Sequence, residues 1–460
     1  MTKSYSKLLF LLAAMVAVAL TAAAQQRSDL DLVVTGAQQS PRIAVPDAQG
    51  PADSREHVAN FNNTLWNDLN SSAQFEMVSK SLYPRTAPRR QEDLQVGDQG
   101  MPDDPGARGL FLTGWSLPPV QAHYLAFGEI ELVNGRLALS GYLYDATAKD
   151  RASGHIFAKR YFASLDAEGA RQLAHDFSRD ILQNLGLGLG LAGTKIYFVS
   201  DRTGFQEIWS MDYDGSNQKQ ITHYKSISFM PAISPEADLI AFTTYVEGLP
   251  KIYVHALETN RRLTFYNQNA SLNATTSFSP DGKKIAFAST AGGVSQIYLA
   301  DLDGRNLRRI SYSRSIDVDP AINPKTGAEI AFVSGRTGIP QVYVMDAEGA
   351  NVRMLSQGGG DAVQPSWDMQ GENIAFAWTR GFEPGNYNIF IANVATGKLA
   401  QLTHGAGRNE NPSWAPSGTH MVFSSNRSGG TQIWTMRADG TQVQRLTSQG
   451  RNFMPAWGKK

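Results

Sequence analysis

The sequence of 460 residues contains no cysteine, and this absence excludes several kinds of site. Without cysteine there is no disulfide, no thiol nucleophile and no thiolate ligand for a metal. An excess of either charge is also lacking, because 42 lysines and arginines balance 42 aspartates and glutamates. A neutral chain has no electrostatic signature of a polyanion partner, so we expect no nucleic acid to bind.

Enzyme motifs are equally scarce. The eight histidines include no pair at a metal-ligand spacing such as HExxH. There is no GxSxG nucleophile elbow and no Walker loop, and the GxGxxG of residues 188–193 follows a predicted helix, the reverse of the dinucleotide-binding order. We therefore expect no catalytic residue, no cofactor and no histidine-bound metal, and we predict that the protein is not an enzyme.

No apolar run reaches the roughly 20 residues that a membrane-spanning helix needs. The thirteen residues from Leu8 to Leu20 follow Lys3 and Lys7 and precede three alanines, which is the layout of a secretory signal peptide. A membrane anchor is the alternative, but the run is short for one. We expect a signal peptide over residues 1–24 and a mature protein that begins at Gln25, lies free in the periplasm and is monomeric.

A motif of two apolar residues and a phenylalanine, or a close variant, recurs six times. It occurs at Ile196 to Phe198, Ile240 to Phe242, Ile285 to Phe287, Ile330 to Phe332, Ile374 to Phe376 and Met421 to Phe423. The spacings are 44, 45, 45, 44 and 47 residues, and a second β-branched and aromatic pair follows each anchor by twelve or fifteen residues. Four strands in about 44 residues is typical of one propeller blade. We predict a mainly β protein with a six-bladed β-propeller over residues 195–460.

The ends of each repeat predict how the ring closes. The last strand of each is expected to end in a hydroxyl residue, as at Thr222 and Ser311, and the innermost strand to begin after a proline, as at Pro320 and Pro412. The first repeat has no such inner strand before Lys195. Residues 453–457 repeat the Pro-x-Trp pattern of the fifth and sixth repeats, so the C-terminal strand should complete the first blade.

Residues 25–185 have a different rhythm and predict a small α/β domain, joined by a glycine-rich linker over residues 186–194. Strands are expected over residues 30–34 and 42–45, and a hairpin over residues 124–144 turns at Asn134-Gly135. Helical spacing of apolar residues predicts helices over residues 56–69 and 167–185. Residues 79–109 are rich in proline and charge, and we expect a mobile surface loop there, with partner binding as the alternative.

Propeller ligands usually bind at one mouth of the channel, so the loops before the inner strands hold the candidate site. The candidates are Ser228, Asn273, Asp317, Asp319, Asp361, Gln364, Glu410, Asn411, Arg451 and Asn452. Four carboxylates against one arginine predict an acidic mouth for a basic peptide or a divalent cation, although turn capping would explain several of these residues. A recurring arginine, at 202, 336 and 427, is expected to brace neighbouring blades, with contact to a partner as the alternative.

The chain resembles the TolB-type β-propeller family, the periplasmic component of the Tol-Pal system. The likeness lies in the propeller repeat, in the paired strands of the α/β domain and, most specifically, in the junction of the two domains. The propeller repeat is best preserved at residues 278–311 and 412–447. The paired strands are residues 124–128 and 141–145, and the junction covers residues 171–200.

The resemblance implies a non-enzymatic scaffold that maintains outer-membrane integrity and constriction during cell division. The propeller mouth would bind the peptidoglycan-associated lipoprotein Pal, and the mature N-terminal segment would recruit inner-membrane TolA. For the second role the candidates are Gln25, Arg27, Asp29, Leu30 and Leu32. Leu272 stands where family members carry a histidine near the Pal contact. Two alternatives stay open: an envelope propeller with another protein or peptide partner, and a propeller hydrolase or lyase.

Overall fold

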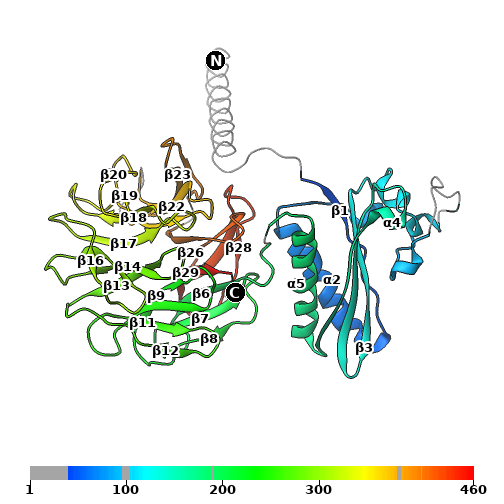
Figure 1. Ribbon diagram of the computed structural model, residues 1–460, viewed down its shortest axis with the longest axis horizontal. Coiled ribbons are helices and arrows are strands. Elements are labelled where there is room, and N and C mark those ends of the chain that lie inside the picture. The colour runs from blue at the N-terminus through cyan, green and yellow to red at the C-terminus, as the bar shows by residue number, and fades with distance from the viewer. Residues whose placement is uncertain are drawn as a thin grey trace, which may run out of the picture. The chain divides into compact units, whose positions relative to one another are not determined.

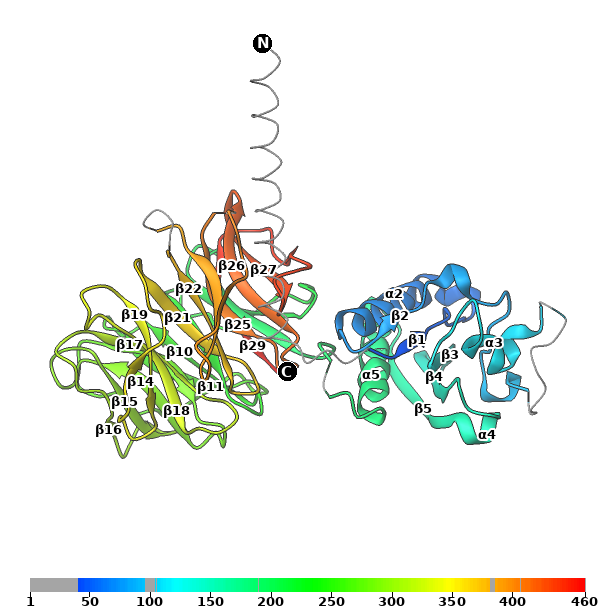
Figure 2. The same ribbon diagram turned by 90° about the horizontal axis from the view of Figure 1, so that it is seen from above.

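The computed structural model describes residues 40–95, 104, 106–188, 190–380, 385–405 and 407–459. The chain divides into two compact units, one covering Gln38–Gly193 and the other running from Thr194 to the C-terminus (Figures 1 and 2). The expected signal peptide, the strand expected over residues 30–34 and the N-terminal candidates from Gln25 to Leu32 all lie outside the described residues.

The second unit is a six-bladed propeller made of six four-stranded antiparallel sheets (Figure 1). The inner strands are β29 (Asn452–Gly458), β9 (Ser228–Ile233), β13 (Asn273–Phe278), β17 (Asp317–Ile322), β21 (Ala362–Trp367) and β25 (Asn409–Trp414). The next strands are β6 (Lys195–Ser200), β10 (Leu239–Thr244), β14 (Lys284–Ser289), β18 (Glu329–Ser334), β22 (Asn373–Trp378) and β26 (His420–Ser428). The third strands are β7 (Glu207–Asp212), β11 (Lys251–Ala256), β15 (Gln296–Asp301), β19 (Gln341–Asp346), β23 (Asn388–Asn393) and β27 (Gly430–Arg437). The outer strands are β8 (Lys219–Gln220), β12 (Arg261–Leu263), β16 (Arg308–Arg309), β20 (Arg353–Met354), β24 (Leu399–Gln401) and β28 (Gln444–Arg445).

The six anchor motifs occupy the second strand of each blade, as predicted. Their phenylalanines, such as Phe198 and Phe332, are fully buried because each sheet packs between two neighbours. The predicted closure is also confirmed, since β29 pairs with β6 from Asn452 opposite Ser200 to Gly458 opposite Lys195. The C-terminal strand is thus the inner strand of the first blade.

Two predicted strand boundaries were wrong. The prolines do not precede the inner strands; Pro320, for example, is the fourth residue of β17 and lies at a shift in the register. The outer strands end before the hydroxyl residues. In five of the six blades this hydroxyl accepts a hydrogen bond from the third strand instead, as Thr222 Oγ1 does from the Ile208 N–H at 2.8 Å.

The first unit has a five-stranded sheet in the order β2-β1-β3-β4-β5, in which β1 is parallel to both neighbours and the other pairs are antiparallel. Its elements are β1 (Arg42–Ala44), α2 (Arg55–Ser71), β2 (Glu76–Met77), α3 (Thr113–Ser116), β3 (Tyr124–Val133), β4 (Arg136–Asp145), α4 (Arg151–Gly154), β5 (His155–Ser164) and α5 (Ala167–Asn184). The predicted hairpin and both predicted helices are present. Strand β5 was missed because Lys159 and Arg160 interrupt its alternating pattern.

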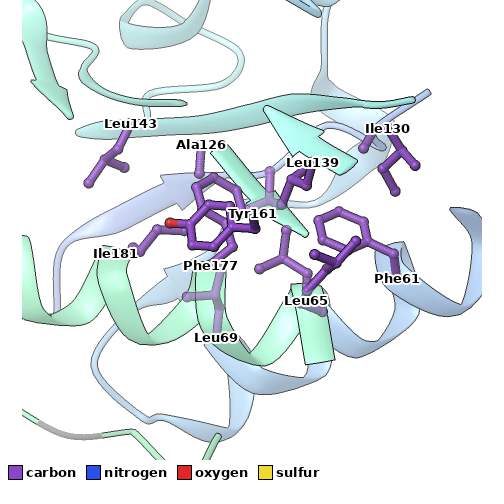
Figure 3. Close-up of a cluster of buried hydrophobic side chains, with 14 of the residues drawn as sticks. Phe61, Leu65, Leu69, Ala126, Ile130, Leu139, Leu143, Tyr161, Phe177 and Ile181 are labelled. Atoms are coloured by element: carbon purple, nitrogen blue, oxygen red, sulfur yellow. The ribbon is translucent and has the colours of Figure 1, made fainter. Parts of the chain in front are cut away.

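Helices α2 and α5 cover one face of this sheet, and Figure 3 shows the core between them. Phe61 and Leu65 of α2 and Phe177 of α5 meet Leu139 of β4 and Tyr161 of β5, all almost fully buried. Burial of such side chains stabilises the fold by about 1.5–3 kcal/mol each. The unit therefore has a core of its own.

The opposite face is covered by the segment that was expected to be a mobile loop, and that prediction was wrong for its described part. Short 3-10 helices occur at Lys80–Leu82 and Gln91–Asp93. Leu94 is buried against the sheet, and the Tyr83 hydroxyl donates to the Val78 carbonyl at 2.9 Å. A few well-placed apolar groups anchor a segment whose composition is otherwise polar.

Candidate protein-binding site

The propeller channel is lined by the third residue of every inner strand. These residues are Met230, Thr275, Asp319, Gln364, Asn411 and Met454, and all have a positive φ between 51° and 59°. The left-handed conformation accompanies a β-bulge, which aims the side chain of an inner strand into the channel. Together with the residues that follow them, five of which are prolines, they enclose a cavity of about 160 Å³.

Asp319 is the one carboxylate in this ring. Burial raises its pKa to about 6, because desolvation disfavours the charged form. Among the described residues no charged partner offsets this effect. Nearby, Gln364 Oε1 accepts the backbone N–H of Asn411 at 2.9 Å, and Asn411 Oδ1 accepts from Ser424 Oγ at 2.9 Å. The amides are thus partly satisfied within the ring, whereas Asp319 is available to a ligand.

A second cavity of about 450 Å³ opens beside the channel and shares Gln364, Asn411 and Met454 with it. Its wall adds Gln206, Arg408, Glu410, Ser424, Asn426, Thr431, Arg451 and Phe453. We call the channel ring and this cavity together the mouth. The size lies within the range of ligand pockets, roughly 300–1,000 Å³. The structure therefore brings Asp319, Gln364, Glu410, Asn411 and Arg451 together, as predicted.

The mouth is not the acidic surface that the sequence predicts. Glu410 forms an ion pair with Arg408 at 2.7 Å, and Arg451 forms one with Asp201 at 2.7 Å. Two of these partners, Arg408 and Asp201, were not among the candidates. Because these charges are paired, the net charge of the mouth is close to zero. Its polar groups include both hydrogen-bond donors and acceptors.

Three candidates lie elsewhere. Ser228, Asn273 and Asp317 are the first residues of inner strands, and they are buried rather than exposed in loops. Each is held by hydrogen bonds: Ser228 Oγ donates to Thr244 Oγ1 at 3.1 Å, and Asn273 Oδ1 accepts from Ser289 Oγ at 2.9 Å. Asp317 meets Arg336 at 3.5 Å. Their placement indicates a structural role.

Three further positions also lie outside the cavities of the mouth. Asp361 is half-buried, and its N–H donates to Thr379 Oγ1 at 2.8 Å. Leu272, at the position of the family histidine, is half-buried too, and its N–H donates to Thr290 Oγ1 at 3.0 Å. Asn452 is fully buried and accepts from Arg202.

The recurring arginine braces strands within one blade, not neighbouring blades as predicted. Arg336 Nε donates to Ser334 Oγ of β18 at 2.8 Å, while its Nη2 meets Asp317 of β17. Arg202 repeats this with Ser200 and Asn452, and Arg427 with Ser425 and Asn409. Each guanidinium also lies over an aromatic ring of the same blade, as Arg336 does over Tyr343 at 4.7 Å.

Sequence reasoning missed an apolar rim beside the mouth. Ile227 and Ile316 directly precede β9 and β17, Tyr245, Val246 and Leu249 follow β10, and Ile339 follows β18; all six side chains are exposed. We call these six residues the apolar rim. The sequence did hold a signal for this rim, because these large apolar residues lie among polar turn residues. Large exposed apolar groups in turns often mark an interaction surface.

No three histidine, aspartate or glutamate side chains of the described chain come together in a way that could hold a metal ion. No described helix is both long and apolar enough to cross a membrane. Asp319 is the carboxylate of the channel ring that could bind a cation. That alternative stays a prediction.

Comparison with known proteins gives one consistent result. The TolB beta propeller domain model matches residues 183–383 and 379–460, which together exceed half of the chain. A Tol-Pal system protein TolB from Bordetella parapertussis is 30% identical over 318 residues, covering 69% of this chain and 64% of the relative. A protein TolB homolog from Chlorobium luteolum is 33% identical over 240 residues, covering 48% of this chain and 50% of the relative.

The chain thus covers about one third to two thirds of the length of the first curated relatives. For another Chlorobium homolog this share is 32%. The crystal structure of TolB from Acinetobacter baumannii superposes with a TM-score of 0.68, at 24% identity, over 92% of this chain and 97% of that one. This likeness shows a shared fold. The relatives bear the name of a Tol-Pal component and not of an enzyme, in agreement with the sequence-based expectation. The chain belongs to the TolB β-propeller family.

Proposed function

We propose that this protein is the TolB component of a Tol-Pal system, a periplasmic, non-enzymatic scaffold that maintains outer-membrane integrity and constriction at division. Its mouth binds a Pal-like peptidoglycan-associated lipoprotein. Its mature N-terminal segment, residues 25–32, recruits a TolA-like inner-membrane protein. Membership of the family supports the proposal, and the observation that carries it is the mouth with its apolar rim.

The chemistry of the mouth suits a folded protein partner. The apolar rim offers exposed aliphatic and aromatic groups such as Ile227, Leu249 and Tyr245, and burying such groups drives association. The adjoining cavity offers paired charges and amides, which give specificity and register. Protein interfaces usually combine apolar side chains with polar groups in this way.

A binding measurement tests the Pal assignment. Titration calorimetry with the soluble domain of the same organism's Pal-like lipoprotein should give a Kd at or below about 1 µM. Ile227→Ser should weaken binding at least about tenfold, because a few buried apolar contacts carry much of the energy of an interface. Val443→Ser is the matched control, since Val443 is similarly exposed but precedes the outer strand β28.

The outcomes separate the alternatives. If wild type fails to bind this domain but Ile227→Ser abolishes capture of another envelope protein, the protein is a propeller scaffold with a different partner. If neither substitution changes binding, the apolar rim is not part of the interface. Deletion of residues 25–32 should abolish TolA binding and leave Pal binding intact, and an unchanged TolA affinity would remove the N-terminal segment from the proposal.

A further inference from the structure

Arginines concentrate on the outer edge of the third blade. Arg305, Arg308, Arg309 and Arg314 fall within ten residues, on β16 and the segments that flank it. Arg305, Arg308 and Arg314 are exposed and Arg309 is half-buried. Two aspartates, Asp301 and Asp303, lie in the same stretch, so residues 301–314 carry four positive and two negative charges within a chain that is formally neutral.

Three of these four arginines, Arg308, Arg309 and Arg314, have no ion pair within the described residues, unlike several other arginines of the propeller. Arg308 Nη2 donates to the Ala347 carbonyl at 2.9 Å, and Arg309 Nε donates to the Ser311 carbonyl at 2.8 Å. Within the described residues their one carboxylate contact is Arg305 to Asp303 at 3.9 Å, and both side chains are exposed. By contrast, Arg353, at the equivalent position of β20, meets Glu329 at 2.9 Å.

Exposed apolar side chains accompany the charge. Tyr312 is 73% exposed and Ile316 59%, the two largest values among the exposed large hydrophobic residues described. Tyr312 lies two residues before Arg314 in the chain, whereas Ile316 belongs to the apolar rim beside the mouth. The Arg309 guanidinium lies 4.8 Å from the centre of the Tyr312 ring, and the tyrosine hydroxyl donates to the Arg309 carbonyl at 2.9 Å. Tyr312 is thus held outward.

We propose that this edge, with Arg305, Arg308, Arg309, Tyr312 and Arg314, binds the surface of an anionic phospholipid bilayer. Unpaired arginines suit phosphate headgroups, with which guanidinium forms bidentate hydrogen bonds. Tyrosine suits the interfacial layer, where an amphipathic ring is favoured.

The shape of the edge favours a membrane over a peptide. Both ribbon views place β16 at the rim of the propeller (Figures 1 and 2), and none of these residues lines the cavities of the mouth. Exposed side chains on an outer strand can reach a flat surface, whereas an extended peptide segment is usually bound in a groove. Self-association through this edge would bring like charges together and is disfavoured.

Vesicle co-sedimentation of the full mature protein tests the proposal. We expect binding to vesicles of 30% phosphatidylglycerol in phosphatidylcholine at low salt, and little binding to phosphatidylcholine alone. Each arginine should contribute about fivefold to the partition coefficient. A variant carrying R308Q, R309Q and R314Q should therefore lose about a hundredfold. Binding should also fall in 0.5 M salt, where the Debye length is below about 5 Å.

Arg353→Gln is the matched control, because it removes an arginine of the same strand position that is already neutralised. Tyr312→Ser should weaken vesicle binding further without changing the charge. Circular dichroism checks that the variants are folded, and unchanged Pal affinity in the triple variant keeps this surface distinct from the proposed mouth interface.

Three results would overturn the proposal. One is no binding to phosphatidylglycerol vesicles. Another is an equal loss from Arg353→Gln and from Arg308→Gln, which would indicate non-specific charge attraction. The third is tight binding of a polyglutamate peptide without vesicle binding, which would assign the edge to an acidic protein partner.

Discussion

The indole N–H of Trp457 donates to Thr194 Oγ1 at 2.9 Å, joining two residues 263 positions apart. Both are almost fully buried. Since Thr194 directly precedes β6 and Trp457 lies in β29, this contact ties the last strand of the ring to the first. It also explains why the two ends of the propeller sequence must fold together.

We expect Trp457→Ala to lower the free energy of unfolding by about 3–5 kcal/mol, because it leaves a cavity where the ring closes. Trp457→Phe keeps the apolar contact and should cost only about 1–2 kcal/mol. Urea unfolding followed by circular dichroism measures both. Equal effects of the two substitutions would mean that the hydrogen bond, not the packing, closes the ring.

Asp319→Asn should stabilise the protein at pH 7.5. Burial raises the pKa of Asp319 to about 6 in the folded state, above the unfolded value of about 3.9, so the stability it contributes is present below pH 4 and is lost as the pH rises through 6. Removing the charge should gain about 1–2 kcal/mol at pH 7.5, a figure reduced from the full shift because the channel admits solvent. Thermal melts of both proteins should converge near pH 4.

His420 gives the opposite pH dependence. Burial lowers its pKa to about 4, so its stabilising effect is present above the unfolded pKa of about 6.5 and is lost as the pH falls. Wild type should lose about 2 kcal/mol from this group between pH 7.5 and 5, and His420→Gln should not. Asp319 changes stability in the other direction over that range, so the comparison is best made in an Asp319→Asn background.

Arg336→Met should be more destabilising than Arg202→Met. The first leaves the buried Asp317 carboxylate without its cation, at a cost of about 3–5 kcal/mol, whereas the second leaves only the neutral Asn452 amide. Denaturant unfolding of the two variants measures the difference. Arg427→Met, which faces Asn409, should resemble Arg202→Met, and equal losses in all three would show that the aromatic stacking dominates.

The β-strand pattern and the ring closure could be predicted because each depends on a short local sequence pattern. A β-branched residue before an aromatic marks a strand buried on both faces, and Pro-Ala-Trp at residues 455–457 matches the inner strands of other blades. The start of the inner strands could not be predicted in the same way. A left-handed residue before a proline, as at Asp319, reads as a turn when the partner strand is unknown.

The site was predicted only in part, for a related reason. Asp317 and Asp319 are two residues apart and look alike in sequence, yet one is buried beside Arg336 and the other faces the channel. The pairing of Glu410 with Arg408 and of Arg451 with Asp201 depends on which loops meet in space. Counting carboxylates therefore overstated the negative charge of the mouth.

In the ring of six left-handed residues, the backbone conformation of the channel does not depend on which side chain each position carries. Methionine, threonine, aspartate, glutamine and asparagine all occupy one conformation there, so the propeller holds that geometry whichever of these side chains is present. A single substitution at Met230 or Gln364 could change what the channel recognises without altering how the blades are built. Relatives with the same fold can thus diverge in partner choice one ring position at a time.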